Sequence, residues 1–355
     1  MYERRLDNLR RLMEERKLDA YFTVHPANIY YLSGYRGDTG YLLVTLKEAY
    51  LYTYPLFMME AEEQTTKEVN VRILKDSSYL KLIQDDLKDS HSMAIEKDYI
   101  THSIYKDLFC ALSDKIRPIS NLAGELRKNK DEKEIEFMKK AQEITDRIFR
   151  HVLNLNLSSM TELDLAAEME YQMKKLGAEG YSFKTIVAAG ENSAIPHARP
   201  RNVKIGSRTN LLMDFGVYYM GYASDMTRTI HIGNASEEFK KVYNIVLNAQ
   251  KEAENAVKKG KKANEIDQIA RKIIEDAGYG EQFTHGLGHG VGIEVHELPR
   301  VNRRSEEILE ENMVITIEPG IYFKNKFGVR IEDMVIVKKD GFEIITQSPK
   351  ELIEL

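Results

Sequence analysis

The sequence predicts a protein of the α/β class, in which an α/β region is followed by an α+β region where helices pack on a mixed β-sheet. Two observations favour this class: the first third alternates helical and strand patterns, and the remainder combines long amphipathic helices with strand-rich stretches. A length of 355 residues favours two domains. The polar segment RKNKDEKE precedes the first long helix, so we expect domains at residues 1–125 and 126–355.

The first domain is predicted to open with a helix that ends near Lys17, because Leu6, Leu9 and Met13 recur at helical spacing. Four strands are then expected, each an aromatic or β-branched run bounded by Gly, Pro, Asn or Asp. They cover residues 20–24, 40–45, 51–55 and 69–74.

The second domain is predicted to begin with a long helix from Asp131. Thr161 and Asp164 match a capping box at the start of the next helix, which Gly177 would end. Two more helices are expected after Ser236 and over residues 263–277. The remaining strands are expected in four runs: LLMDFGV, YASDMTRTIHI, NMVITIEPGIYF and GVRIEDMVIV.

Composition excludes several classes of protein. The chain is 43% hydrophobic and 30% charged and has no apolar run long enough to span a bilayer, so we expect no membrane association. Acidic residues interrupt the basic amino-terminal segment and no apolar stretch follows it, so no leader peptide is expected. A net charge of -5 argues against nucleic acid as a partner. One cysteine, Cys110, excludes an intrachain disulfide and suits a reducing cytoplasm.

Four acidic residues stand in strand patterns that are otherwise apolar. Asp214 and Asp225 lie eleven residues apart, and Gly221 between them favours a hairpin that brings them together. Glu318 and Glu332 occupy the last two strand runs, where the two-residue period would put Arg330 and Glu332 on one face. A single acid at such a position is more often exposed or ion-paired. A buried carboxylate must be protonated, paired or metal-bound.

Three of the nine histidines share residues 284–297 with four glycines. A three-histidine zinc site is one interpretation, but the four acids favour an oxygen-rich site with one imidazole from His289. The glycines would let neighbouring backbone approach His289 closely. Such a donor set suits two divalent ions and metal-assisted hydrolysis.

These stretches resemble a known family. MDFGVYYMGYASDMTRT, HGLGHGVGIEVHELP, TIEPGIYF and GVRIEDMV together are similar to the pita-bread metallopeptidases, the Xaa-Pro dipeptidases (prolidases) and aminopeptidase P. YYLSGYRGDTGYLLVT resembles the creatinase-like amino-terminal domain of that family. The resemblance implies a creatinase-like domain at residues 1–125 and a pita-bread catalytic domain, a curved mixed sheet covered by helices, at residues 126–355.

The resemblance also implies a site with two divalent metal ions per subunit. Asp225 and Glu332 would bridge both ions, Asp214 would chelate one, and His289 with Glu318 would hold the other. Manganese is the first expectation, with cobalt, zinc or iron as alternatives. A metal-bridging hydroxide would attack the substrate, with Glu318 as the general base.

Other residues receive roles from the same resemblance. His197 and His296 would contact the substrate and transition state, and His285 would line the cavity. Arg330 would orient Asp225 or another ligand. Tyr322 and Phe183 would line the pocket, although aromatic residues beside strands are more often part of the core. The expected substrates are small peptides with proline in the second position, and the expected assembly is a homodimer.

Several alternatives stay open. Dipeptidases and aminopeptidase P share these motifs and differ in whether the substrate extends beyond proline. A methionine-aminopeptidase-like enzyme shares the metal set but normally lacks the large first domain. A creatinase-like enzyme lacks the metal ligands, and a non-catalytic pita-bread binding module would have lost one or more of them. All five ligand positions are filled here.

Overall fold

The computed structural model describes residues 1–74, 79–88 and 90–355. The chain forms two compact units, Met1–Arg127 and Lys128–Leu355. Within the described ranges, no helix is long and apolar enough to cross a membrane.

The first unit contains a six-stranded mixed sheet with the strand order β4-β3-β2-β1-β5-β6. The β1-β2-β3 segment is antiparallel, and the other neighbours are parallel. Its strands are β1 (Ala20–Thr23), β2 (Tyr41–Thr45), β3 (Ala49–Thr53), β4 (Asn70–Ile73), β5 (Met93–Glu96) and β6 (Ile116–Ile119). The first four correspond to the four predicted strands.

Six α-helices are described in the first unit: α1 precedes β1, α6 follows β6, and the others connect strands along the chain. They are α1 (Tyr2–Glu15), α2 (Pro26–Ser33), α3 (Met58–Gln64), α4 (Tyr79–Leu87), α5 (His102–Leu112) and α6 (Leu122–Arg127). The predicted apolar stripe of the first helix is confirmed, because Leu6, Leu9 and Met13 are fully buried.

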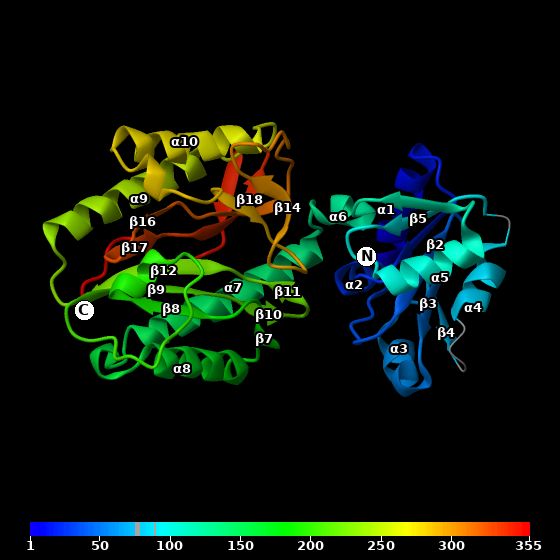
Figure 1. The fold of residues 1–355 in the computed structure, drawn as a ribbon, viewed down its shortest axis with the longest axis horizontal. Coiled ribbons are helices and arrows are strands. Elements are labelled where there is room, and N and C mark those ends of the chain that lie inside the picture. The colour runs from blue at the N-terminus through cyan, green and yellow to red at the C-terminus, as the bar shows by residue number, and fades with distance from the viewer. Residues whose placement is uncertain (75–78, 89) are drawn as a thin grey trace. The chain divides into compact units, whose positions relative to one another are not determined.

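Four long helices frame the second unit: α7 (Glu132–Val152), α8 (Glu162–Lys175), α9 (Glu237–Asn255) and α10 (Ala263–Asp276). The predicted capping box of Thr161 and Asp164 is confirmed. The helix expected after Ser236 is present, and the Ser236 side chain caps it by accepting a hydrogen bond from Phe239 N–H. Gly177 follows α8 with a φ of 90°, a left-handed conformation that favours glycine. The α7/α8 and α9/α10 pairs lie on opposite sides of the strands (Figure 1).

Two main sheets lie between the helix pairs. One is antiparallel, with the order β12-β9-β8, and the other has the order β14-β13-β15-β18-β19. The first contains β8 (Ile186–Ala189), β9 (Thr209–Phe215) and β12 (Met226–Ile232). The second contains β13 (Gly288–Gly290), β14 (Glu297–Val301), β15 (Val314–Ile317), β18 (Asp333–Lys338) and β19 (Gly341–Ile344). Smaller sheets comprise β7 (Gly180–Tyr181), β10 (Val217–Tyr219) and β11 (Tyr222–Ala223), and β16 (Gly320–Phe323) with β17 (Phe327–Arg330).

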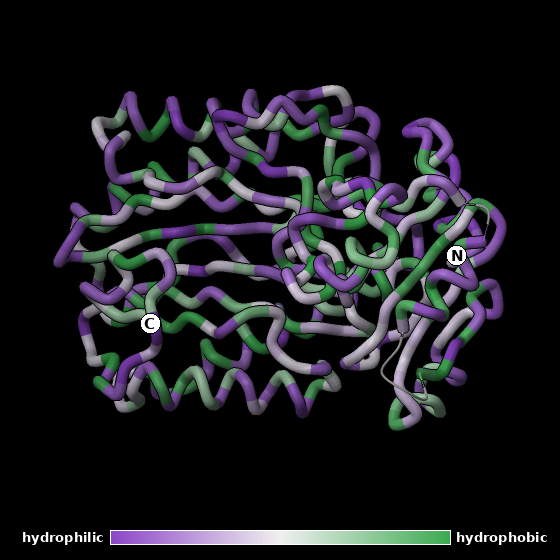
Figure 2. Tube along the Cα trace, turned by 45° about the vertical axis from the view of Figure 1, so that its right-hand side comes forward, coloured by the Kyte–Doolittle hydropathy of each residue, from purple (hydrophilic) through white to green (hydrophobic). Residues whose placement is uncertain are grey.

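Each main sheet buries one face against its own helix pair. Leu211, Met213 and Phe215 belong to the core that contains α7 and α8, whereas Ile315 and Ile317 belong to the core that contains α9 and α10. Hydrophilic and hydrophobic stretches alternate along the turns of α8 and α10, the lower and upper helices in Figure 2. Because side chains alternate along a strand, the residues between the core positions occupy the opposite faces of the sheets.

All four predicted strand runs of the second unit are interrupted, which corrects the sequence interpretation. LLMDFGV divides into β9 and β10 at Gly216, and YASDMTRTIHI divides into β11 and β12 at Ser224 and Asp225. The other two breaks fall at the predicted glutamates. NMVITIEPGIYF divides into β15 and β16 at Glu318, and GVRIEDMVIV divides into β17 and β18 at Ile331 and Glu332. At the Glu318 and Glu332 breaks the backbone N–H bonds to a residue outside the adjoining hairpin. Glu318 N–H donates to Leu287 O (2.8 Å), and Glu332 N–H donates to Thr227 O (3.2 Å). The two-residue strand period therefore does not extend from Arg330 to Glu332.

Candidate metal centre

The β9–β12 pairing brings the two aspartates together, as the predicted hairpin requires. Asp214 lies opposite Thr227, and Phe215 lies opposite Met226. Asp225 directly precedes β12, after the short β10–β11 excursion. Asp214 alternates with the core residues Met213 and Phe215, so it occupies the face of β9 away from α7 and α8.

His289 lies in the middle of β13, where glycine on either side allows close approach. A Cβ atom on Gly288 would lie 2.1 Å from Thr316 O, and one on Gly290 would lie 2.1 Å from Leu298 O. Side chains cannot occupy either position without displacing a neighbouring strand. The predicted reason for these glycines is therefore confirmed at Gly288 and Gly290.

Glu318 and Glu332 lie at the two strand breaks, and a threonine contacts each of them. Thr227 Oγ1 donates to Glu332 Oε2 at 2.7 Å, and Thr316 Oγ1 donates to Glu318 Oε1 at 3.3 Å. Sequence reasoning missed both threonines. The signal available was their position, since each lies two residues from a predicted acid, in DMT and TIE.

The ligand atoms converge in the folded chain. Asp225, His289 and Glu332 each offer one ligand atom, and these atoms lie within 4.8 Å of one another. His289 Nε2 is 3.6 Å from Asp225 Oδ2 and 3.3 Å from Glu318 Oε1. Asp214 adjoins this group through Arg330, whose Nη2 donates to Asp214 Oδ2 at 2.5 Å.

The carboxylates raise one another's pKa values. Burial raises the pKa of Asp225 well above its usual range, and the charges of Glu332, Asp214 and Glu318 add to the shift. Burial, with the charges of Glu318 and Asp214, does the same to the pKa of Glu332. Three buried carboxylates and the half-buried Glu318 thus compete for the compensating charges of Arg330 and His289.

Glu318 differs from its neighbours. Burial alone would raise its pKa, but the hydrogen bond and charge of His289, together with the charges of His285 and Arg330, lower the pKa to about 2. Its carboxylate therefore has the strongest tendency in the cluster to remain ionised.

The donor set fits divalent cations. One oxygen, Asp214 Oδ1, is buried and has no hydrogen-bond partner within the described structure. An unpaired buried carboxylate oxygen is costly, and the four carboxylates need more positive charge than one arginine and one histidine supply. Carboxylate oxygens with a single imidazole nitrogen suit ions such as Mn, Co, Zn or Fe.

A hydrogen-bonded row adjoins the cluster. His285 Nε2 is 2.9 Å from Tyr322 Oη, and Arg330 Nη1 donates to the same Tyr322 oxygen at 2.7 Å. Arg330 thus holds Asp214 and Tyr322 at once. The expectation that Arg330 contacts Asp225 or another proposed ligand is met through Asp214.

The remaining predicted residues lie at differing distances from the cluster. The His296 ring is 4.3 Å from the His289 ring, measured between centroids, and is exposed. His197 is exposed in the loop after β8. It lies close enough to Asp214 to affect it electrostatically: burial raises the pKa of Asp214, and the charges of Arg330 and His197 oppose that rise. Phe183 is half-buried in the turn after β7 and is not one of the residues that form the described hydrogen-bonded cluster.

A cavity of about 530 Å³ borders His285. Arg300, which also lines it, lies opposite His289 in the β13–β14 register, but none of the five proposed metal ligands is among the residues that line the cavity. Arg303 and Arg304 add further positive charge to its wall. Sequence reasoning did not single out these three arginines, although LPRVNRR is a visible basic run.

The second unit brings carboxylates and one imidazole together between two sheets. Such a site is typical of a metal-dependent enzyme. Residues 136–339 match the model of metallopeptidase family M24, and residues 5–128 match the creatinase/prolidase amino-terminal domain. The chain belongs to metallopeptidase family M24. The predicted resemblance and the predicted fold class, a creatinase-like domain followed by a pita-bread domain, are both confirmed.

Relatives cover the whole chain. An Xaa-Pro dipeptidase of Pyrococcus furiosus is 39% identical over 98% of this chain and 99% of its own length. The solved structure of an Xaa-Pro dipeptidase from Bacillus anthracis is 36% identical, covers 100% of both chains and has a TM-score of 0.96. That of an X-Pro aminopeptidase from Thermotoga maritima is 37% identical, covers 99% of both chains and has a TM-score of 0.91.

Proposed function

We propose that this metallopeptidase hydrolyses the bond between an amino-terminal residue and proline, in dipeptides or at the amino terminus of longer peptides. The observation that carries the proposal is the cluster of four carboxylates, three of them buried, and one imidazole, with Asp214 Oδ1 unpartnered in the described structure. The chain is also similar to enzymes of both names. The dipeptidase is the first candidate, and aminopeptidase P is the alternative.

Two divalent ions would be held by five residues. Asp225 and Glu332 are suited to bridge them, because their carboxylates are buried among the other acids. Asp214 would hold one ion, and His289 with Glu318 the other. Manganese is our first assignment, with cobalt, zinc or iron as alternatives. When bound, such ions supply Lewis acidity and lower the pKa of a water molecule enough to make it a nucleophile at neutral pH.

Glu318 has the position and charge of a general base. Its carboxylate is held ionised by His289, so it can accept a proton from the attacking water. The same carboxylate can then deliver that proton to the prolyl nitrogen, which leaves as a secondary amine. Like any amide nitrogen, the prolyl nitrogen must gain a proton to depart as a neutral amine, and this delivery supplies it.

His197 and His296 are proposed to contact the scissile carbonyl. Partial desolvation of the ring, although the residue is exposed at the surface, and the charge of His289 lower the pKa of His296. A neutral imidazole at this position can donate one hydrogen bond to a carbonyl oxygen as negative charge develops. His285 and Tyr322 are proposed to line the pocket, and their mutual hydrogen bond holds the two side chains in place. Phe183 is proposed only as a lining residue.

The decisive experiment strips the purified protein with a chelator and reloads it with Mn²⁺ or Co²⁺. It is then offered an Xaa-Pro dipeptide, an Xaa-Pro-Xaa tripeptide and a Met-Ala-Xaa peptide. We expect metal-dependent release of the residue before proline. No release from any peptide would refute an enzymatic role and favour a binding module, and preferential release of Met would select a methionine aminopeptidase.

We also propose a homodimer and a reducing cytoplasmic setting, the latter because the single cysteine, Cys110, is free and exposed. Sedimentation equilibrium of the purified protein tests the assembly: a monomer mass at micromolar concentration would rule out the dimer.

A further inference from the structure

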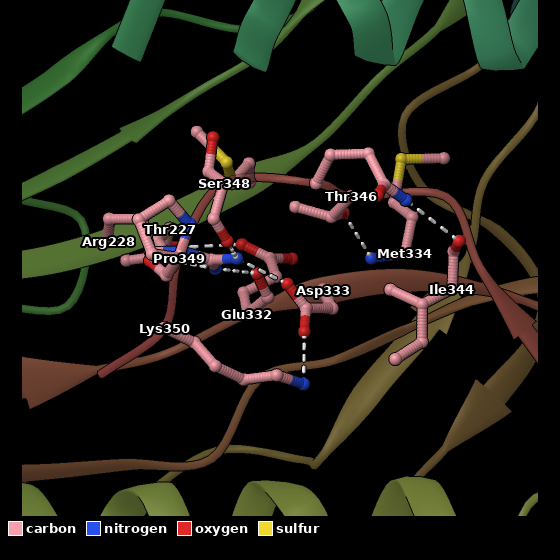
Figure 3. Close-up of polar contacts among 12 residues, drawn as sticks. Thr227, Arg228, Glu332, Asp333, Met334, Ile344, Thr346, Ser348, Pro349 and Lys350 are labelled. Carbon is pink, nitrogen blue, oxygen red and sulfur yellow. Dashed lines mark hydrogen bonds and ion pairs between the residues drawn. The ribbon is translucent and has the colours of Figure 1, made fainter. Parts of the chain in front are cut away.

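A buried ion network lies beside Glu332 on the helix side of the sheets. Arg228 Nη2 is 2.5 Å from Asp333 Oδ1, and both side chains are 1% exposed. Lys350 Nζ is 2.5 Å from Asp333 Oδ2 and 2.6 Å from Glu254 Oε2. Figure 3 shows Lys350 reaching toward Asp333 from one side while Arg228 lies beside Ser348 and Pro349 on the other. The proposed reaction mechanism uses none of these charged groups.

Arg228 is joined directly to the backbone that carries Glu332. Its Nη1 donates to Glu332 O and to Thr227 O, the latter at 2.9 Å. Thr227 in turn receives the Glu332 N–H at 3.2 Å and donates its hydroxyl to Glu332 Oε2 at 2.7 Å. One guanidinium therefore holds the main chain on both sides of the contact that orients the Glu332 carboxylate.

Residues 348–350 complete the network from a distant part of the chain. Arg228 donates to Ser348 O at 2.7 Å and to Pro349 O at 2.9 Å. Ser348 is itself anchored to α7, because its N–H and hydroxyl donate to Asp146 Oδ1 at 2.8 and 2.6 Å. The segment thus links α7 to the interrupted strand at Glu332.

The network pairs two cations with two carboxyl groups. Arg228 and Lys350 face Asp333 and Glu254, so removal of either cation leaves the buried Asp333 carboxylate with too little compensating charge. Glu332 lies at a strand break, where the regular ladder of hydrogen bonds no longer fixes its backbone. Outer residues that orient a metal ligand commonly change metal affinity or activity by 10–100-fold when replaced.

We propose that Arg228, Asp333 and Lys350 are positioning residues for Glu332, and that residues 348–350 thereby control the affinity of the site for divalent metal ions. This inference rests on the proposed role of Glu332 as a metal ligand. It assigns a function in the metal site to a segment that lies outside the cluster itself.

The test compares Lys350→Met with a matched control, Lys251→Met. Both remove one lysine charge, but Lys251 pairs with Glu351 at the surface, where the two side chains are 43% and 67% exposed. Isothermal titration of the metal-free proteins with Mn²⁺ should show a dissociation constant about tenfold or more higher for Lys350→Met and unchanged for Lys251→Met. The visible absorption spectrum of the Co²⁺-loaded protein should change only in Lys350→Met.

A purely structural role gives a different result. It would lower the Tm of the metal-free and metal-loaded forms equally and leave the Mn²⁺ dissociation constant and the Co²⁺ spectrum unchanged, which would overturn the inference. Arg228→Lys should show the larger loss of affinity; if it does not fold, Lys350→Met alone decides. Absence of divalent-ion binding by the wild-type protein would instead contradict the proposed function.

Discussion

Asp225 is the residue in which burial and charge conflict most clearly. It is 4% exposed, and three other carboxylates raise its pKa. A protein gains nothing in stability from such a group without cations, which supports its proposed role in bridging two of them. The surrounding residues can be sorted by replacing one side chain at a time.

Replacing Asp225 with Asn should abolish nearly all activity and leave the fold intact. The amide preserves the shape of the side chain but removes the charge proposed to bridge the ions. Turnover of an Xaa-Pro dipeptide measures the loss, and circular dichroism checks the fold. A folded Asp225→Asn protein with wild-type turnover would show that the site assignment is wrong.

His296 and His289 should separate into a substrate contact and a metal ligand. In His296→Ala we expect turnover to fall by about 10²-fold, the size of one lost transition-state hydrogen bond, with metal content retained. In His289→Ala we expect the metal content itself to fall. Metal analysis after dialysis distinguishes the two, and equal metal loss in both variants would reverse the assignment.

Glu254 makes the stability of the chain depend on pH. Burial, with the charge of Asp333, raises the pKa of Glu254 to about 7 despite the opposing charge of Lys350. A carboxyl whose pKa is higher in the folded state stabilises the fold at low pH, and this contribution is lost as pH rises through 7. The free energy of unfolding should therefore decline between pH 5 and 8, by about 3 kcal/mol from this group.

The variant Glu254→Gln isolates that contribution. Its free energy of unfolding, measured with urea at pH 5 and pH 8, should decline less than that of the wild type over the same interval. Identical pH dependence in the two proteins would mean that Glu254 does not titrate in this range.

Breaks in the strands position the two glutamates of the site. Glu318 and Glu332 lie where β15 and β18 meet the β16–β17 hairpin, so their side chains are not part of a continuous strand face. β13 is the complementary case, since it carries His289 and is closely packed on both sides. The glycines of β13 are therefore structural requirements for placing His289 in the proposed metal centre.

Replacing Gly290 with Ala should destabilise the second unit by about 2–3 kcal/mol, because the new Cβ overlaps Leu298 O on β14. Urea unfolding gives the free energy. The matched control is Gly341→Ala, where a Cβ has no neighbour within 4 Å in the described structure. Equal stability of the two variants would contradict the proposed close packing of β13.

For the chain as a whole, metal binding should couple the two sheets of the second unit. Asp214 and Asp225 come from one sheet and His289 from the other, so cations among them would join both. Ligands that bind only the folded state raise its stability. Chelation should lower the Tm, and added Mn²⁺ should restore it. An unchanged Tm in differential scanning calorimetry would argue that the cluster is stable without ions.

Local patterns were sufficient to predict much of this organisation. The apolar spacing of α1 and α7, the capping box of α8, and the first four strands follow from interactions between residues close in sequence. Motif resemblance likewise identified the family, because its acids and histidines occur in a specific order.

The strand breaks at Glu318 and Glu332 could not be read from their apolar neighbours. Each is set by a hydrogen bond to a residue distant in sequence, Leu287 for Glu318 and Thr227 for Glu332. The same is true of the contact between Arg330 and Asp214 and of the arginine-lined cavity. Periodicity describes one element at a time, so the sequence identified the acids as exceptions to an apolar strand pattern. Only the packing of separate sheets determined which of their atoms meet and which neighbouring residues hold the acids in place.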